Sequence, residues 1–390
     1  MLAQYRCAAR ATPLAPDGRM GVALIRASPA RAGTPRAALA RALLVAVILG
    51  TLPGCGTLYL AQAAAGQWHV MHERRPIDAV VLDERTPEAV RQTLFGVREA
   101  REFASSELKL PDNRSYRTYA DIHRPYVVWN VVATPEFSVD PKRWCFPIAG
   151  CVAYRGYFSE NKARLFAAEL AQEGLDVTVG GVPAYSTLGK FADPVLSTML
   201  AYGDKELAAM IFHELAHQLL YVKNDSEFNE AFATTVEDTG LQRWLKLRGD
   251  AEGILQYRQE RERERTFVNL FTQARKQLAK LYASGVGVSS MRARKAEILL
   301  HLATDLRDLE RRLKVRSSVY EEWLAKGLNN AQLASLATYY DCVPGFERLL
   351  AEQDGDLPRF YAAVRELAKL PRADRHEKLC RKPLSAGGSG

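Results

Sequence analysis

The feature that most constrains this chain of 390 residues is the pattern His213-Glu214-Leu215-Ala216-His217. Histidines four positions apart project from one face of a helix, so both imidazoles can reach one metal ion while Glu214 faces the open side of that ion. Apolar residues around the pattern predict a largely interior helix over 204–222. A buried carboxylate without a partner is costly, whereas a metal-bound water gives Glu214 one. The pattern therefore predicts a buried metal helix.

The third ligand follows from helical geometry. A polar turn at 223–225 leads into a second predicted helix over 226–247. At 1.5 Å per residue, His217 stands roughly 7.5 Å below that turn and Glu230 roughly 6 Å below it, on the returning helix. Glu227 would lie nearer the turn, and Glu237 would lie about 10 Å too deep. We therefore expect His213, His217 and Glu230 to hold Zn²⁺ with a fourth position open, as catalytic zinc sites do.

The segment around this third ligand carries a resemblance. Asn229-Glu230-Ala231-Phe232-Ala233 resembles the Asn-Glu-Gly-Phe-Ala segment that holds the third zinc ligand in gluzincin aminopeptidases. Only twelve residues separate His217 from Glu230, fewer than is usual in those enzymes, which implies a tighter hairpin and a distinct family. Thr234 stands where thermolysin-type enzymes have an acid, and Glu237 is the candidate to orient a ligand histidine in its place.

The wider sequence resembles a bacterial family of predicted lipoprotein aminopeptidases. The matching stretches run through most of the chain after the leader: Gly66-Gln67, Pro111-Asp112-Asn113, 124–130, 144–151, 154–158, 183–189, Thr338-Tyr339-Tyr340 and Val343-Pro344. The resemblance implies an α+β, predominantly helical fold with a zincin-like active-site region, a small sheet and a helical C-terminal part. It also implies a peptide substrate, whose bonds would be hydrolysed with Glu214 as general base.

Two further roles are assigned by position. Tyr339, Tyr340 and Tyr221 are candidate donors to the transition-state oxyanion, although packing is the commoner role of a tyrosine.

Gluzincins place a substrate-binding edge strand before the metal helix, so we expect Val182, Ala184, Tyr185 and Ser186 to line the cleft. No glutamate occurs from Gly180 to Gly189 to bind a substrate amine, and Asp193, Glu206 or Glu227 are the alternatives.

The leader explains the net charge. Of the formal charge of +8, residues 1–54 carry +6, from seven arginines and one aspartate. The nearly neutral remainder argues against a nucleic-acid partner. An apolar run of eleven residues, 42–52, is too short to span a bilayer but typical of a signal peptide. It leads into Leu52-Pro53-Gly54-Cys55, which resembles a bacterial lipobox. We expect a lipid on Cys55 and a periplasmic position at the cell envelope, with the outer membrane favoured; a plain cleaved signal or an anchor helix is the alternative.

Cysteine spacing agrees with export. Five residues separate Cys145 from Cys151, with Pro147 and Gly150 to turn the chain, and we expect a disulfide there. Zinc binding by this pair is the weaker alternative, and whether Cys342 pairs with Cys380 is left open.

Patterning gives the organisation of the chain. We expect a signal peptide at 1–54, an α+β region with the cysteine loop at 55–175, the zincin-like catalytic core at 176–248, a charged helical hairpin at 249–316, a helical region at 317–384 and a flexible tail at 385–390. Strands are expected over 126–133 and 177–188.

Two other functions remain open: a catalytically silent envelope lipoprotein that serves as a scaffold, and a metallohydrolase acting on cell-wall peptides. The sequence leaves the oligomeric state open.

Overall fold

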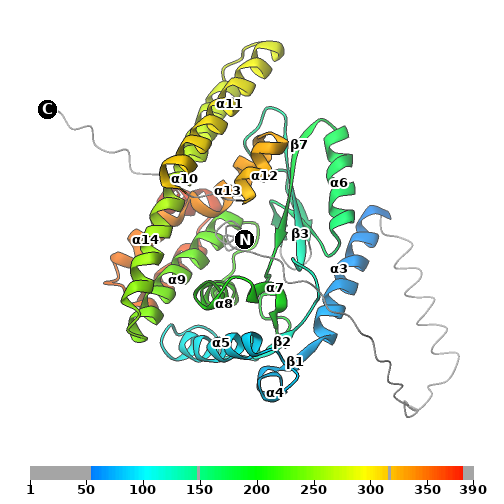
Figure 1. The fold of residues 1–390 in the computed structure, drawn as a ribbon. Coiled ribbons are helices and arrows are strands. Elements are labelled where there is room, and N and C mark those ends of the chain that lie inside the picture. Colours follow the sequence, from blue (N-terminus) through cyan, green and yellow to red (C-terminus); the bar gives the residue numbers. More distant parts are fainter. Residues whose placement is uncertain (1–53, 147–149, 315–317, 381–390) are drawn as a thin grey trace, which may run out of the picture.

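The computed structural model describes residues 54–146, 150–314 and 318–380 (Figure 1). The predicted signal peptide, except Gly54, and the predicted tail lie outside the described residues. The fold is a predominantly helical α+β fold, as the sequence predicts. The strands are β1 (Arg74–Pro76), β2 (Thr118–Ala120), β3 (Val128–Pro135), β4 (Trp144–Phe146), β5 (Gly150–Val152), β6 (Arg155–Tyr157), β7 (Leu175–Val182) and β8 (Val195–Leu196).

Helices make up most of the described chain. In the first half they are α3 (Gly54–His72), α4 (Ile77–Leu82), α5 (Glu88–Ser106), α6 (Glu160–Gln172), α7 (Ser197–Leu200) and α8 (Asp204–Leu219). In the second half they are α9 (Ser226–Leu247), α10 (Ala251–Tyr282), α11 (Val288–Leu313), α12 (Ser318–Lys326), α13 (Asn330–Tyr340), α14 (Val343–Ala351), α15 (Leu357–Ala368) and α16 (Arg372–Leu379). Among the described residues, no helix is long and apolar enough to cross a membrane.

The sheet that borders the site has the strand order β6-β3-β7, with both pairings antiparallel. Side chains alternate between the faces of a strand. Trp129, Val131 and Ala133 of β3 form an apolar cluster with residues of α6. Val128 and Asn130, on the other face, line the cavity described below. The sheet is therefore one wall of that cavity.

β7 is shorter than predicted. The sequence suggested strand material over 177–188, but pairing with β3 ends at Val182, which lies opposite Val128. Pro183 has no N–H group to donate to a sheet, and its carbonyl oxygen instead accepts a hydrogen bond from Thr198 Oγ1 at 2.6 Å. Residues after Val182 consequently reach the site as a loop.

The predicted metal helix is α8, and its residues from Leu207 to His217 are all buried. It packs between α5 and α9 (Figure 1). α9 begins and ends where the sequence predicts, at Ser226 and Leu247. α8 ends at Leu219, three residues earlier than expected, because Leu220 is already extended.

The charged hairpin is formed by α10 and α11, which project to one side of the molecule (Figure 1). α10 starts at Ala251 because the side chain of Asp250 caps it by accepting a hydrogen bond from Gly253 N at 2.7 Å. Apolar side chains of the hairpin pack with α12 and α13, including Phe271, Leu306 and Trp323.

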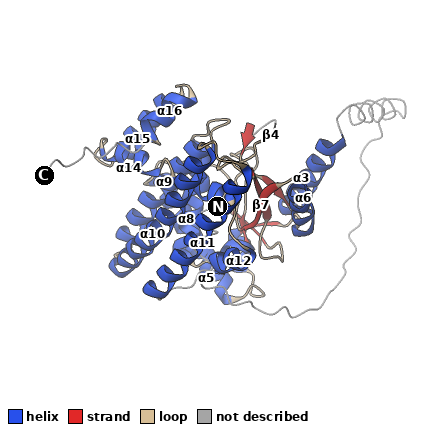
Figure 2. Ribbon diagram, turned by 90° about the horizontal axis from the view of Figure 1, so that it is seen from above, coloured by secondary structure: helices blue, strands red, loops and turns tan. Residues whose placement is uncertain are grey.

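α3 and the C-terminal helices occupy opposite sides of the molecule. α3 lies beside α6 at one margin, and α14, α15 and α16 lie at the other (Figure 2). Cys55, the predicted lipid site, falls in the first turn of α3.

Candidate active site

Three donor atoms from α8 and α9 converge. His213 Nε2 lies 3.1 Å from His217 Nε2 and 3.3 Å from Glu230 Oε2. His217 Nε2 lies 3.6 Å from the same carboxylate oxygen. These are the three residues that the sequence selects as ligands, and all three are largely buried. Among the described residues, they form one of three groups whose donor atoms lie close enough to hold a cation.

Glu237 lies behind the first histidine. Its Oε2 is 3.0 Å from His213 Nδ1, and its side chain is 4% exposed. A proton shared on that side fixes the ring so that the Nε2 lone pair points at His217 and Glu230. Glu237 is too deep to be a ligand but is placed to orient one, the role suggested for it from the sequence.

The electrostatics of this group favour a cation. Burial by itself lowers the pKa of His213, but the hydrogen bonds and negative charges of Glu230 and Glu237 raise it to about 9. Burial by itself raises the pKa of Glu230, but the two histidines hold it well below its ordinary value. The carboxylates thus create a site that stabilises positive charge, whether it is a proton or a metal ion.

The hairpin between α8 and α9 is closed by Asn229, the residue before Glu230. Its side-chain oxygen accepts a hydrogen bond from Val222 N, and its side-chain nitrogen donates one to Val222 O, both at 2.8 Å. This pairing holds the chain at the point where it enters α9. Glu230 is the next residue of the same helix, so its height opposite His217 is fixed by the pairing.

The cysteine loop supports the hairpin turn on one side. Cys145 and Cys151 form the disulfide that their spacing predicts. Cys151 N donates a hydrogen bond of 2.7 Å to Asn224 Oδ1. Arg143 donates to the backbone oxygens of both Asn224 and Cys151, at 2.7 and 2.9 Å. The loop is therefore attached directly to the turn between the two ligand-bearing helices.

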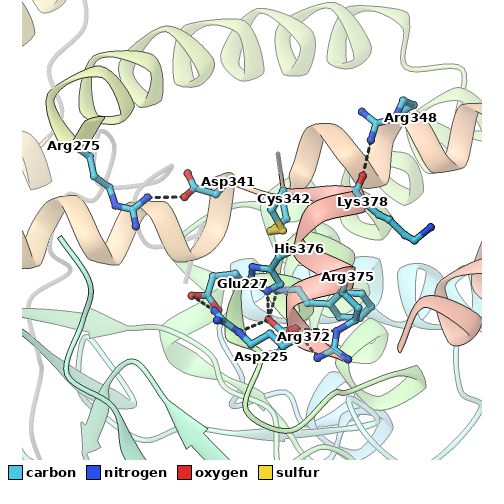
Figure 3. Close-up of a disulfide and its surroundings, with 12 residues drawn as sticks. Asp225, Glu227, Arg275, Asp341, Cys342, Arg348, Arg372, Arg375, His376 and Lys378 are labelled. Carbon is cyan, nitrogen blue, oxygen red and sulfur yellow. Dashed lines mark hydrogen bonds and ion pairs between the residues drawn. A yellow bond between two sulfur atoms is a disulfide. The ribbon is translucent and has the colours of Figure 1, made fainter. Parts of the chain in front are cut away.

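α16 supports the turn on the other side (Figure 3). Arg375 donates hydrogen bonds of 3.0 and 2.8 Å to Asp225 Oδ2, and His376 Nε2 lies 2.7 Å from Oδ1. Asp225 also caps α9. A second disulfide joins Cys342 to Cys380 and ties the end of α16 to the start of α14.

Another of the three close donor groups contains Asp225, Glu227 and His376. The two carboxylates of this group already pair with arginines, Asp225 with Arg375 and Glu227 with Arg372. We interpret this group as structural.

A cavity of about 500 Å³ opens beside the metal-ligand group. Glu214, which is 7% exposed, lines it together with the three candidate ligands. The structure brings six more of the sequence candidates to its wall: Val182, Ala184, Tyr185, Ser186, Tyr221 and Tyr339. The loop after β7 therefore meets α8 and α9 at one cavity.

Other candidates lie elsewhere. The hydroxyl of Tyr340 donates a hydrogen bond to Glu264 on α10, so we remove Tyr340 from the oxyanion donors. Asp193 accepts hydrogen bonds from Thr187, and burial is the main reason that its pKa rises to about 6. Glu227 is paired with Arg372. Glu206 lies in the first turn of α8, at the end remote from His217. None of these residues lines the cavity in the described part of the chain.

Tyr154 is a cavity residue that sequence reasoning passed over. Burial raises its pKa well above the ordinary value, and the charges of Glu230 and Glu214 add to the effect. Its hydroxyl therefore stays protonated close to both carboxylates. Tyr154 belongs to the 154–158 stretch that carries the family resemblance, which was the available signal.

α3 supplies a wall that the sequence did not predict. Tyr59, Leu60, Ala63 and Gln67 line the cavity. The guanidinium of Arg155 lies 4.1 Å from the centroid of the Tyr59 ring and helps hold the helix on the sheet. Contacts between residues so far apart in the chain leave no periodic pattern in the sequence.

Within the part of the chain that the structure describes, only one of the two polar atoms of the Gln67 side chain has a hydrogen-bond partner. Its side-chain oxygen accepts a hydrogen bond from the Tyr185 hydroxyl. Its side-chain nitrogen is buried and has no partner among the described residues.

Comparison with known proteins places the chain in a family. Searches of curated proteins and of solved structures each found no match. The family model described as "Putative aminopeptidase" matches residues 58–379, which contain every residue of the cavity and of the metal-ligand group. Because that match covers most of the sequence, the chain belongs to this aminopeptidase family.

Proposed function

We propose that the protein is a zinc-dependent aminopeptidase whose metal is held by His213, His217 and Glu230. The observation that carries this proposal is the convergence of two imidazole nitrogens and one carboxylate oxygen beside a cavity lined by Glu214. The family description supports peptidase chemistry. The donor set, two histidines and a glutamate, is one that catalytic zinc sites use.

The spacing of the donors fits this metal. In a tetrahedral site with bonds of 2.0–2.2 Å, any two donor atoms stand roughly 3.3–3.6 Å apart. The three separations here are 3.1, 3.3 and 3.6 Å. When bound, zinc would act as a Lewis acid on the scissile carbonyl and lower the pKa of a coordinated water to about 7.

Glu214 is the proposed general base. It lies next to one ligand in sequence and lines the cavity that the ligands border. In this position its carboxylate accepts a proton from the attacking water and returns it to the leaving amine. Tyr154 is the proposed donor to the oxyanion, because it lines the cavity and lies near enough to Glu230 and Glu214 for the charges of both to act on its hydroxyl.

The cavity lining suggests the substrate. Most lining side chains are apolar or aromatic, among them Phe146, Val152 and Leu188. We propose peptides with an apolar N-terminal residue. Among the described lining residues, Glu214 and Glu230 are the only carboxylates, so a carboxylate of the cavity wall that binds a substrate amine would have to be one of these two.

The proposed location follows from the leader. We propose that the chain is exported and tethered to the periplasmic face of the envelope, with the outer membrane favoured, through lipid on Cys55. The arginine-rich segment and apolar run before Cys55 support export. The two disulfides also suit an oxidising compartment.

The test combines metal analysis with a mixed peptide library whose products are identified by mass. We expect loss of single apolar N-terminal residues by the wild type. Glu214→Gln should keep the metal and lose turnover, whereas Glu260→Gln, on the exposed face of α10, should change neither. Internal cuts would make the enzyme an endopeptidase, and hydrolysis by Glu214→Gln would remove Glu214 from the mechanism. The absence of any cleavage would favour a scaffold.

A further inference from the structure

The outward face of α3 is apolar and uncharged. Along this helix the exposed positions recur with helical periodicity: Leu60, Ala61, Ala64, Ala65, Trp68, His69 and His72. Trp68 is 66% exposed and stacks on His72, with ring centroids 5.0 Å apart. The helix contains no Asp, Glu, Lys or Arg in its 19 residues. A surface helix normally turns charged residues to water, as α10 does, so this face is unusual.

Apolar exposure continues from α3 onto the cavity rim. Leu60 is 45% exposed and Phe191 is 49% exposed, and both residues line the cavity. They come from different parts of the chain, α3 and the loop after β7. Leu60 belongs both to the outward face of α3 and to the cavity wall, so the two surfaces meet at this residue. Exposed apolar patches of this kind mark contact sites.

The chain leading into α3 indicates what this surface contacts. The apolar run 42–52 ends immediately before the helix, and Cys55 lies in its first turn. At 1.5 Å per residue, Leu60 stands roughly 8 Å along the helix axis from Cys55. A lipid on Cys55 would hold the start of α3 at the bilayer surface. α3 also lies at the margin of the molecule, away from α14–α16 (Figure 2).

We propose that the outward face of α3, with Phe191, docks on a phospholipid bilayer. Trp68 would then lie among the headgroups, where tryptophan is favoured. Because α3 carries no Asp, Glu, Lys or Arg, the contact would be mainly hydrophobic and only weakly dependent on salt.

Docking in this way brings the cavity mouth to the membrane. If the proposed peptidase function holds, on which this step rests, the preferred substrates are peptides held at the membrane surface. Tyr59 and Gln67 of the same helix line the cavity wall. One helix would then contact the lipid and contribute to the substrate site.

Bromolipid quenching tests the docking directly. The full chain is incorporated into phosphatidylcholine vesicles with brominated or ordinary acyl chains, and tryptophan fluorescence is compared. Bromine quenches an indole only at close range, so a docked Trp68 should give clear quenching in the wild type. Trp68→Phe should lose most of it, and Trp144→Phe should keep it. Equal quenching in wild type and Trp68→Phe, or none in the wild type, would overturn the proposal.

A second measurement separates this inference from the peptidase proposal. The same peptide is offered free in solution or tethered to the vesicles. We expect faster hydrolysis of the tethered peptide by the wild type, and loss of that preference with unchanged hydrolysis of the free peptide in Trp68→Ser. Equal rates on both peptides would contradict the substrate inference. Quenching without hydrolysis of either peptide would contradict the peptidase function and leave the membrane contact supported.

Discussion

The Nδ1 atom of His213 lies 3.0 Å from Glu237 Oε2. Glu237 is on α9, seven residues after the candidate ligand Glu230. α9 therefore carries both a candidate metal ligand and a carboxylate behind one of the histidines. Such partners fix the orientation of a ligand ring and raise its basicity. The short hairpin between α8 and α9 makes this arrangement possible with two helices.

We predict that Glu237→Gln weakens zinc binding by about 10- to 100-fold, because the amide orients His213 but no longer raises its basicity. Competition with a zinc-binding dye measures the effect. Glu260→Gln is the matched control on an exposed helix face. Unchanged zinc affinity in Glu237→Gln would show that the contact is structural alone.

Tyr154→Phe should lower kcat by about 10²–10³ with little change in KM, since the lost hydrogen bond forms only as the oxyanion develops. Tyr221→Phe and Tyr339→Phe are the comparisons, because both residues line the same cavity. If either of them produced the larger loss of kcat, the donor assignment would move to that residue.

Gly66→Ala should displace α3. A Cβ atom at position 66 would lie 2.1 Å from Phe158 Cγ, an atom near the base of a ring that cannot swing away cheaply. We expect destabilisation of about 1–3 kcal/mol from overpacking. KM should also rise, because Gln67 and Tyr59 move with the helix. Ala65→Ser, at an exposed position, is the control, and denaturant unfolding with steady-state kinetics provides both readouts. A wild-type KM in Gly66→Ala would contradict the assignment of α3 as a cavity wall.

Arg375→Met should destabilise the fold by about 1.5–3 kcal/mol, since the buried Asp225 carboxylate loses the charged hydrogen bonds of Arg375 and keeps only its contacts with His376 and Arg372. Arg359→Met, at an exposed pair, should have little effect. Urea unfolding at neutral pH measures the difference. A loss no larger than that of Arg359→Met would mean that α16 does not secure the hairpin turn.

The stabilisation that the Asp225–Arg375 pair provides should depend on pH. Burial by itself raises the pKa of Asp225, but His376 and Arg375 outweigh it and hold the pKa below its ordinary value. The pairing therefore stabilises the protein above the ordinary carboxyl range and loses its effect as the pH falls through the lowered pKa. The stability difference between wild type and Arg375→Met should shrink on acidification.

Local patterns predicted the α8–α9 hairpin and the convergence of its donor atoms. Helical spacing selected His213, His217 and Glu230, and the limits of α9 coincide with the predicted ones. α8 ended three residues earlier than predicted, at Leu219, because the backbone is already extended at Leu220. The strand expected over 177–188 stopped at Val182 because Pro183 cannot extend a sheet.

Long-range contacts could not be predicted in the same way. Tyr154 and α3 reach the cavity from distant parts of the chain, and the pairing of Asp225 with Arg375 spans 150 residues. A single sequence contains no periodicity that reports such contacts. The disulfide between Cys145 and Cys151 was predictable because its loop is short, whereas the one between Cys342 and Cys380 was not.

The most direct test of the central claim is anomalous scattering at the zinc absorption edge from crystals of the wild-type protein, with zinc content measured on the same sample. We predict one zinc ion per chain, within about 2.0–2.2 Å of His213 Nε2, His217 Nε2 and a carboxylate oxygen of Glu230. An anomalous peak elsewhere, or a zinc-loaded protein with the Glu230 carboxylate turned away from both imidazoles, would contradict it.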